Sequence, residues 1–170
     1  EVTLMFNFTA TTKRLTVSAI VMALYIIILY VTQGISFGAY QIRIATAMYA
    51  LAFVYPFLVI PMGIANLLAN FFFGGLGPID MIGGCLVGII TTYLIVQIRL
   101  RQWPLPLLAL PIWLVPAILV SLWLSYLLHL PYTMLVSSLA VGQLPPAIVG
   151  VILVRAMVKL PAFPNAYGVK

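Results

Sequence analysis

Residues 44–65 read IATAMYALAFVYPFLVIPMGIA, and their interpretation decides the helix count of the fold. The segment is apolar and about as long as the roughly 20 residues with which an α-helix crosses a bilayer. It also contains Pro56 and Pro61, and proline kinks or breaks a helix because it lacks a backbone donor. The segment alone therefore fits one kinked helix or parts of two short helices, 41–54 and 62–73.

The surrounding sequence has the composition of an integral membrane protein. Hydrophobic residues make up 65% of the 170 residues, charged residues make up 6%, and the mean hydropathy is +1.23. Such a chain has too few polar side chains to cover a soluble domain. Its apolar runs have helical length and lack the alternation of a transmembrane barrel. We therefore expect an all-α membrane protein, with further spans at residues 15–32, 79–98, 105–128 and 132–158.

The basic residues favour six spans over five. With six spans, the basic residues that flank apolar runs all fall on one side of the membrane, whereas five spans divide them. These residues are Lys13, Arg14, Arg99, Arg101, Arg155, Lys159 and Lys170. Because Lys and Arg are enriched in cytoplasmic loops, we expect a six-transmembrane-helix bundle with both termini in the cytoplasm.

This topology predicts one domain and a particular place for its short helices. Residues 13–160 form the six-helix membrane domain, between an N-terminal lead-in at 1–12 and a C-terminal tail at 161–170. The second and third spans are then only about 18 to 21 Å long at 1.5 Å per residue. We expect these helices to lie inside the bundle or to end at a water-filled cavity.

Charge and residue inventory argue against several functional classes. The net charge of +6 comes from scattered residues at the ends of apolar runs, which is typical of topology signals and not of a nucleic-acid surface. The single Cys85 permits no intramolecular disulfide, and no Cys and His residues have metal-ligand spacing. The chain lacks a second internal acid, a His-Glu-x-x-His motif and a serine near a base, so we expect no enzyme, metal or cofactor.

Internal polar residues concentrate in two places, Gln41 with Arg43 and the stretch 66–84, NLLANFFFGGLGPIDMIGG. Arg43 and Asp80 are charged, yet they lie neither in the basic flanks of the apolar runs nor at the chain termini. A charge at membrane depth is costly, so it is usually paired, interior and functional. The alternatives are a structural ion pair or two charges that reach the interface. In the six-span topology these groups lie toward the outer face, which predicts a cup that opens outward.

Other polar and aromatic residues have two interpretations each. Asn66 and Asn70 are four residues apart, so they share one helix face and suit either the edge of a heteroaromatic ring or contacts between helices. Gln143 precedes two prolines, which fits a pocket wall or a plain kink. Tyr40 and other tyrosines and tryptophans, Trp123 among them, suit ring stacking or an interfacial belt. The glycines at 74–77 allow a ligand close to the backbone, or simply a tight turn.

Small residues also mark candidate helix contacts. Ala19 and Ala23 lie on one face of the first span, and small residues at this spacing let two helices approach closely. Ala65 with Ala69 and Gly84 with Gly88 have the same spacing, so some of these small-residue faces must pack inside the protein.

Residues 38–49, GAYQIRIATAMY, together with 66–84, resemble the QueT family of substrate-binding S-components in energy-coupling factor (ECF) transporters. The resemblance covers about residues 13–159. It implies a multi-pass protein of the bacterial plasma membrane that docks through Ala19 and Ala23 on a transmembrane coupling subunit, while two ATPase subunits supply energy. It also implies that the substrate is a queuosine precursor of the 7-deazaguanine type.

The residue chemistry is compatible with such a substrate. Asp80 suits an aminomethyl cation or guanine-type donors, and Arg43 suits a carbonyl acceptor or the support of Asp80. The candidate substrate-binding residues are Tyr40, Gln41, Arg43, Asn66, Asn70, Asp80 and Gln143. Alternatives are an S-component for another vitamin-like heterocycle and a non-transporting membrane scaffold subunit. An autonomous carrier is disfavoured because only one internal acid is available for a relay.

Overall fold

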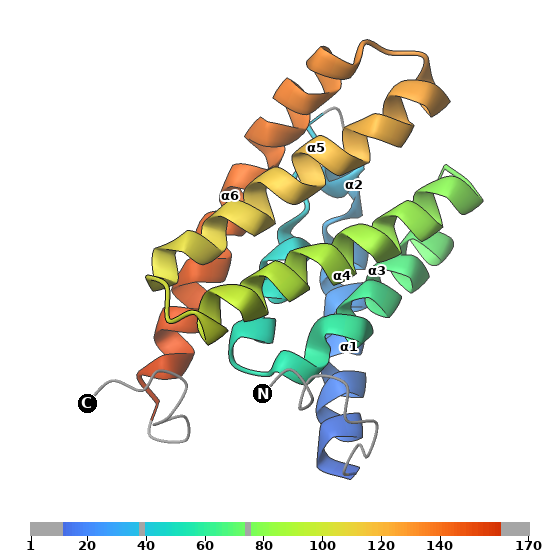
Figure 1. Ribbon diagram of the computed structural model, residues 1–170. Helices are drawn as coiled ribbons and strands as arrows, with labels where there is room; N and C mark the ends of the chain where they lie inside the picture. The colour runs from blue at the N-terminus through green and yellow to red at the C-terminus, as the bar shows by residue number, and fades with distance from the viewer. Residues whose placement is uncertain (1–11, 38–39, 74–75, 161–170) are drawn as a thin grey trace.

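The computed structural model describes residues 12–37, 40–73 and 76–160 of the chain, and helices dominate these residues (Figure 1). In chain order they are α1 (Thr12–Val31), α2 (Gln33–Ser36), the 3₁₀ helices η2 (Ile44–Phe53) and η3 (Pro56–Leu58), α3 (Val59–Phe73), α4 (Pro78–Leu100), the 3₁₀ helix η4 (Leu105–Leu108), α5 (Ala109–Leu128) and α6 (Tyr132–Val158). The all-α prediction is confirmed for this part of the chain. Residues 1–11 of the predicted lead-in, the tail at 161–170 and glycines 74–75 lie outside the described residues.

Residues 44–65 belong to two separate helical segments and not to one kinked helix. The first is η2, and the second begins with η3 at Pro56 and continues into α3. Pro56 and Pro61 both lie near the start of this second segment, where the backbone N–H that proline lacks would have no helical partner. The segment therefore begins at Pro56, six residues before the predicted start at Met62, and its 18 residues have spanning length.

Five helices in the described residues are long and apolar enough to cross a membrane, and η2 is a further, shorter apolar helix. Its ten residues, Ile44–Phe53, rise only about 20 Å at 2.0 Å per residue. Every residue from Ala45 to Phe53 is buried, and η2 packs against α1, α4 and α6. The expectation that a short helix lies inside the bundle is confirmed for η2.

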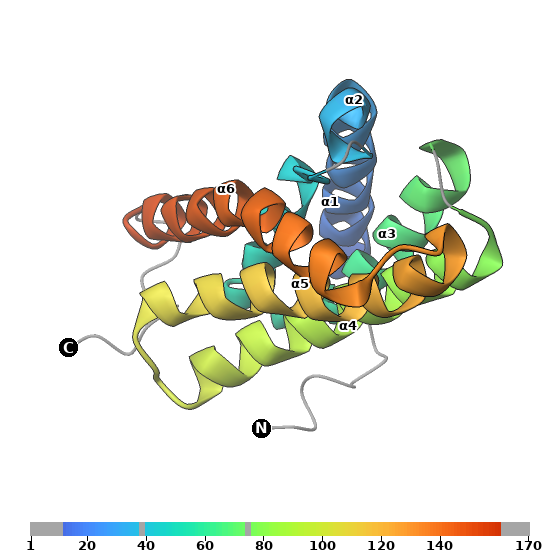
Figure 2. The same ribbon diagram turned by 90° about the horizontal axis from the view of Figure 1, so that it is seen from above.

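The bundle is built from two antiparallel helix pairs and the separate helix α1 around η2. Helices α3 and α4 form one pair, and α5 and α6 form the other, with α4 lying beside α5 (Figures 1 and 2). Helix α1 packs against α3 and η2 and leaves much of its surface exposed. Directly after α1, the four residues Gln33–Ser36 form the short helix α2.

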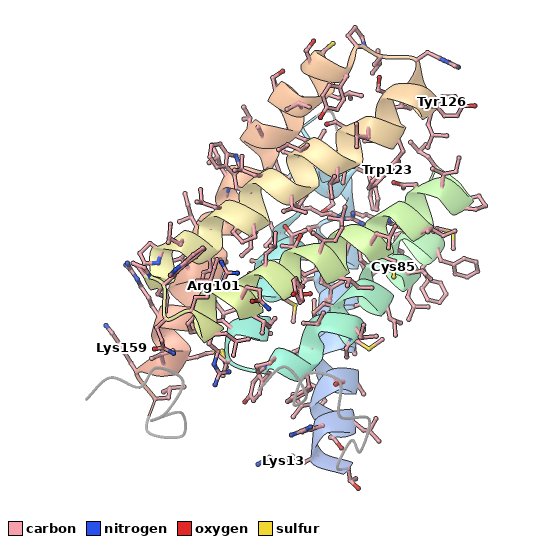
Figure 3. The ribbon with its side chains drawn as sticks, in the orientation of Figure 1. Lys13, Cys85, Arg101, Trp123, Tyr126 and Lys159 are labelled. Atoms are coloured by element: carbon pink, nitrogen blue, oxygen red, sulfur yellow. The ribbon has the colours of Figure 1, made fainter. Side chains whose placement is uncertain are left out.

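The basic residues that flank the apolar runs gather at one end of the bundle. Lys13, Arg101 and Lys159 lie in the lower and left part of Figure 3, whereas Trp123 and Tyr126 lie toward the upper right. The antiparallel arrangement brings the start of α1 and the C-terminal ends of α4 and α6 to this end of the bundle, which agrees with the charge pattern of the sequence. We call it the basic end.

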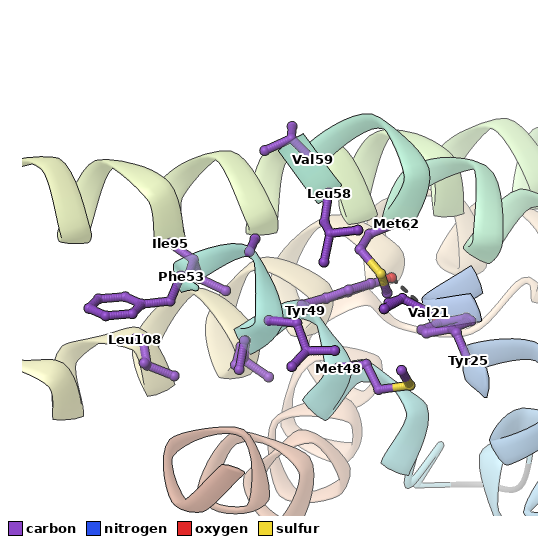
Figure 4. Close-up of a cluster of buried hydrophobic side chains, with 14 of the residues drawn as sticks. Val21, Tyr25, Met48, Tyr49, Phe53, Leu58, Val59, Met62, Ile95 and Leu108 are labelled. Atoms are coloured by element: carbon purple, nitrogen blue, oxygen red, sulfur yellow. Dashed lines mark hydrogen bonds between the residues drawn. The ribbon is translucent and has the colours of Figure 1, made fainter. Parts of the chain in front are cut away.

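A buried apolar cluster holds η2 in the centre. Phe53, Leu58, Met62 and Ile95 are fully buried here, and the cluster joins η2 to α1, α3 and α4 (Figure 4). The rest of η2 is rich in alanine, and small side chains allow the neighbouring helices to approach its backbone. A short, apolar helix is therefore stabilised mainly by its burial.

Arg99 of α4 forms hydrogen bonds with the C-terminal end of η2. Arg99 Nη1 donates hydrogen bonds to the carbonyl oxygens of Phe53 at 2.9 Å and Val54 at 3.0 Å. These carbonyls lie at the C-terminal end of η2, where carbonyl groups have no backbone N–H partner within the helix.

Substitution of Arg99 by alanine is therefore expected to destabilise the protein by about 1.5–3 kcal/mol, the range for hydrogen bonds to a charged group. The loss is measured as a lower unfolding midpoint of the purified protein in detergent. Arg155→Ala is the matched control, because Arg155 is an exposed arginine near the same end of the bundle. Equal midpoints for the two variants would show that Arg99 does not anchor η2.

Candidate functional site

A cavity of about 650 Å³ lies at the end of the bundle opposite the basic end. Its walls come from the segment before η2, the end of α3, the start of α4, the end of α5 and the start of α6. Polar groups come from Gln41, Arg43, Asn70, Asp80, Ser137 and Ser138. Aromatic rings come from Phe37, Tyr40 and Trp123. Most of the remaining wall is aliphatic, so the cavity has the size and mixed lining of a small-molecule site.

Arg43 is a buried cation on the wall of this cavity. Its side chain is 8% exposed, and its Nη2 donates a hydrogen bond to Asn70 Oδ1. The guanidinium carbon lies 5.3 Å from the ring centroid of Phe37, which is cation–π distance. Arg43 Nε is buried and has no hydrogen-bond partner among the described residues. The protein therefore leaves part of this cation's hydrogen-bonding capacity unused.

Asp80 is held by donors from two other segments. Its Oδ1 accepts a hydrogen bond from Trp123 Nε1 at 2.8 Å, and its Oδ2 accepts one from the backbone N of Leu76 at 3.2 Å. The residue lies in the first turn of α4, after Gly77 with its φ of 102° and Pro78 at the first helical position. An ionised carboxylate has about four acceptor sites, so further donors can bind beside these two.

Asn70 links the two charged residues in place of a direct ion pair. Its Oδ1 accepts from Arg43, and its Nδ2 donates to the backbone oxygen of Asp80 at 3.2 Å. The amide thus uses both of its functions in contacts between segments, one of the two roles that the sequence indicated for it. Arg43, Asn70 and Asp80 form one buried polar group, which we call the polar floor.

Asn66 lies one helical turn before Asn70 and outside the cavity. Its Nδ2 donates to Tyr49 Oη at 2.7 Å and to the backbone oxygen of Gly84 at 2.8 Å. The Tyr49 ring in turn stacks on Tyr25 of α1, with 5.8 Å between centroids and 3.3 Å between the hydroxyl oxygens (Figure 4). Asn66 therefore joins α3, η2 and α4 below the polar floor.

Gln143 also lies outside the cavity and supports its rim. Its Nε2 donates to the backbone oxygen of Gln41 at 3.2 Å, and its Oε1 accepts from Thr46 Oγ1 at 3.0 Å. Gln41 has a φ of 45°, in the left-handed region that non-glycine residues seldom occupy. Tyr40, next to it, is 57% exposed and lines the cavity. Gln143 thus fixes an unusual backbone conformation at the rim.

Of the seven candidate binding residues, the structure brings five to the cavity, namely Tyr40, Gln41, Arg43, Asn70 and Asp80. Sequence reasoning did not single out Phe37, Ser137 or Ser138, which also line it. Two of these residues, Ser137 and Ser138, could have been predicted, because they are adjacent polar residues near the outer end of the last span. For Trp123 the sequence indicated two roles, and the structure adds a third, as a donor to Asp80.

Substitution of Trp123 by phenylalanine is expected to weaken ligand binding by about 2- to 12-fold. The variant keeps a ring beside Gly83 but removes the donor that orients Asp80, and one such bond contributes about 0.5–1.5 kcal/mol. Trp113→Phe is the control, because the Trp113 indole donates to Ala140 O at 2.8 Å outside the cavity. Titration calorimetry measures both affinities, and an equal change in the two variants would contradict the role of Trp123.

The five spanning helices and the polar floor define the class of this molecule: a multi-pass membrane protein with a small-molecule cavity at one end of a helical bundle. The family model described as QueT transporter matches residues 15–159, which is most of the chain. The chain therefore belongs to the QueT transporter family and is a membrane transport protein. Comparisons with curated proteins and with solved structures gave no significant match.

Proposed function

We propose that this chain is the substrate-binding S-component of an ECF-type importer and that its cavity captures a queuosine precursor of the 7-deazaguanine type. The observation that carries the proposal is the polar floor, in which a buried cation and a buried carboxylate share one wall of a cavity of about 650 Å³. Charges at membrane depth are costly and usually functional.

The polar floor matches the edge of a deazaguanine. That edge carries neighbouring N–H donors beside a carbonyl oxygen, and it belongs to a flat ring. Asp80 can accept from the donors, and Arg43 can donate to the carbonyl. Phe37, Tyr40 and Trp123 supply rings near the same space, where stacking adds affinity. An aminomethyl group on the ligand would also favour a carboxylate.

The charge distribution supports capture from outside. Basic residues are enriched on the cytoplasmic side of membrane proteins, and here the flanking Lys13, Arg101 and Lys159 lie at the end opposite the cavity. In the proposed orientation the cavity lies at the outer face, and the start of α1 and the end of α6 face the cytoplasm.

The binding function is tested by the thermal unfolding of the purified chain with 7-aminomethyl-7-deazaguanine, 7-cyano-7-deazaguanine and, as controls, guanine and adenine. Ligand at 100 times its Kd stabilises the folded state by about 2.7 kcal/mol. We expect stabilisation by at least one deazaguanine and none by adenine. The absence of any effect from deazaguanines would overturn the substrate assignment, and stabilisation by a different heterocycle would identify another S-component.

Coupling to partner subunits is proposed through α1. Ala19 and Ala23 lie on the exposed side of this helix, away from its buried Val21, Tyr25 and Leu29. Small exposed residues at this spacing allow close approach of a partner helix. The sequence contains no phosphate-binding loop, so the energy for uptake is assigned to the two ATPase subunits.

Substitution of Ala19 by tryptophan is expected to abolish ATP-dependent uptake in proteoliposomes while ligand binding stays within about twofold, because the large side chain blocks docking but lies far from the cavity. Ala156→Trp, on the exposed surface of α6, is the control. Intact uptake and assembly with Ala19→Trp would exclude this docking face. Uptake by the chain alone without ATP would instead indicate an autonomous carrier.

A further inference from the structure

A second cavity of about 460 Å³ lies between α4, η4 and α5, toward the basic end of the bundle. It is a groove with a long aliphatic part and a short polar part. Leu94, Leu110 and Leu114 contribute to the aliphatic part, and all three are at least one-third exposed. Tyr93, Gln97, Arg101 and Trp103 contribute the polar and aromatic groups. None of these residues lines the ligand cavity.

The polar part of the groove has a positive charge that no carboxylate of the described residues compensates. The Arg101 guanidinium carbon lies 5.3 Å from the ring centroid of Trp103, so its contact there is with a neutral ring. The sequence contains two acidic residues, and in the described part of the chain the carboxylate is that of Asp80. Asp80 and Arg101 lie at opposite ends of α4, about 30 Å apart at 1.5 Å per residue. An anion that neutralises Arg101 would therefore come from outside the described chain.

The order of groups along the groove matches the order along a phospholipid. Leu94 lies within the last two turns of α4, and Leu110 and Leu114 lie within the first two turns of α5, so these side chains are on the hydrocarbon side of the connection between the two helices. Trp103 and Arg101 lie after α4 ends, at the level where Trp marks the membrane interface and basic residues meet lipid phosphates. A soluble anion would use only Arg101, whereas a phospholipid would use both parts of the groove.

We propose that the groove between α4 and α5 is a binding site for one anionic phospholipid. An acyl chain lies along Leu94, Leu110 and Leu114, and the headgroup phosphate binds Arg101 beside Gln97 and Trp103. The site lies at the basic end, so the lipid belongs to the cytoplasmic leaflet in the proposed orientation. The inference uses neither the ligand cavity nor the identity of the transported substrate, and the two proposals can fail independently.

Native mass spectrometry of the delipidated full chain tests this site. Phosphatidylglycerol and phosphatidylcholine with identical acyl chains are added separately, and bound lipid per chain is measured against concentration. We expect one preferred phosphatidylglycerol site, with Arg101→Gln weakening it about fivefold and Arg155→Gln leaving it unchanged. Arg101→Lys keeps the charge and is expected to keep most of the affinity. Inorganic phosphate is expected not to displace the lipid, because it lacks the acyl chain.

Four results would overturn the proposal. Equal binding of the two lipids, or equal losses in Arg101→Gln and Arg155→Gln, would show diffuse association with the surface. Unchanged phosphatidylglycerol binding in Leu114→Trp, with the unfolding midpoint preserved, would show that the lipid does not occupy the groove. Displacement of lipid by a co-purified protein partner, with no preference for the anionic headgroup, would assign the groove to a protein interface.

Discussion

Replacement of Arg43 by methionine is expected to weaken ligand binding by about 10- to 150-fold. A hydrogen bond to a charged group contributes about 1.5–3 kcal/mol, and Arg43 is the buried cation of the polar floor. Methionine retains an unbranched side chain of comparable length but removes the charge and all donors. Titration calorimetry with the stabilising deazaguanine measures the loss directly.

Binding and stability together separate this functional role from a structural one. Removal of Arg43 alone leaves the buried Asn70 Oδ1 without its donor, whereas replacement of a whole buried charged set with apolar residues is often neutral or stabilising. We therefore expect Arg43→Met to lose affinity together with about 1–3 kcal/mol of stability, and Arg43→Lys to recover only part of the affinity. Unchanged binding and transport in the double variant Arg43→Met, Asp80→Leu would show that these charges only join helices, as in a scaffold subunit.

Introduction of a side chain at Gly142 is expected to disrupt the rim of the cavity. A Cβ atom built at this position would lie 1.7 Å from the backbone oxygen of Tyr40 and 2.8 Å from its carbonyl carbon. Both are backbone atoms, so the segment that contains Tyr40 and Gln41 must move. Overpacking typically costs about 1–3 kcal/mol, and movement here also breaks the bond from Gln143.

Gly142→Ala is therefore expected to reduce ligand affinity more than about tenfold and to lower the unfolding midpoint. Gly34→Ala is a matched control, because a Cβ at Gly34 would meet no atom within 4 Å. Calorimetry and thermal unfolding measure the two effects. Wild-type affinity in Gly142→Ala would contradict the assignment of the Tyr40–Gln41 segment to the binding site.

Much of the fold follows from local properties of the sequence. Apolar runs of spanning length predicted the long helices, and the prolines at 56 and 61 indicated a break that the structure places at residues 54–55. Charge placement indicated which helix ends lie together. The start of the second segment was misplaced, because a proline that ends one helix also serves well at the start of the next.

The binding site was only partly predictable, because depth in a bundle depends on long-range packing. Asn66 and Asn70 share one helix face, yet one turn separates a residue outside the cavity from one that lines it. Similarly, the hydrogen bond from Trp123 to Asp80 requires α5 to lie beside α4, and no local sequence pattern predicts that neighbourhood. Side-chain chemistry identified polar residues worth considering, and the packing of the helices divided them into contact and support.

The most direct test of the central claim is titration calorimetry of the purified chain with 7-aminomethyl-7-deazaguanine and 7-cyano-7-deazaguanine, repeated with Asp80→Asn. This substitution keeps the shape of the side chain but removes the negative charge that accepts the donors of the ligand. We expect saturable one-to-one binding of at least one compound to the wild-type chain and a loss of about tenfold or more with Asp80→Asn. Absence of binding to both compounds, or equal affinity for the wild-type and Asp80→Asn chains, would contradict it.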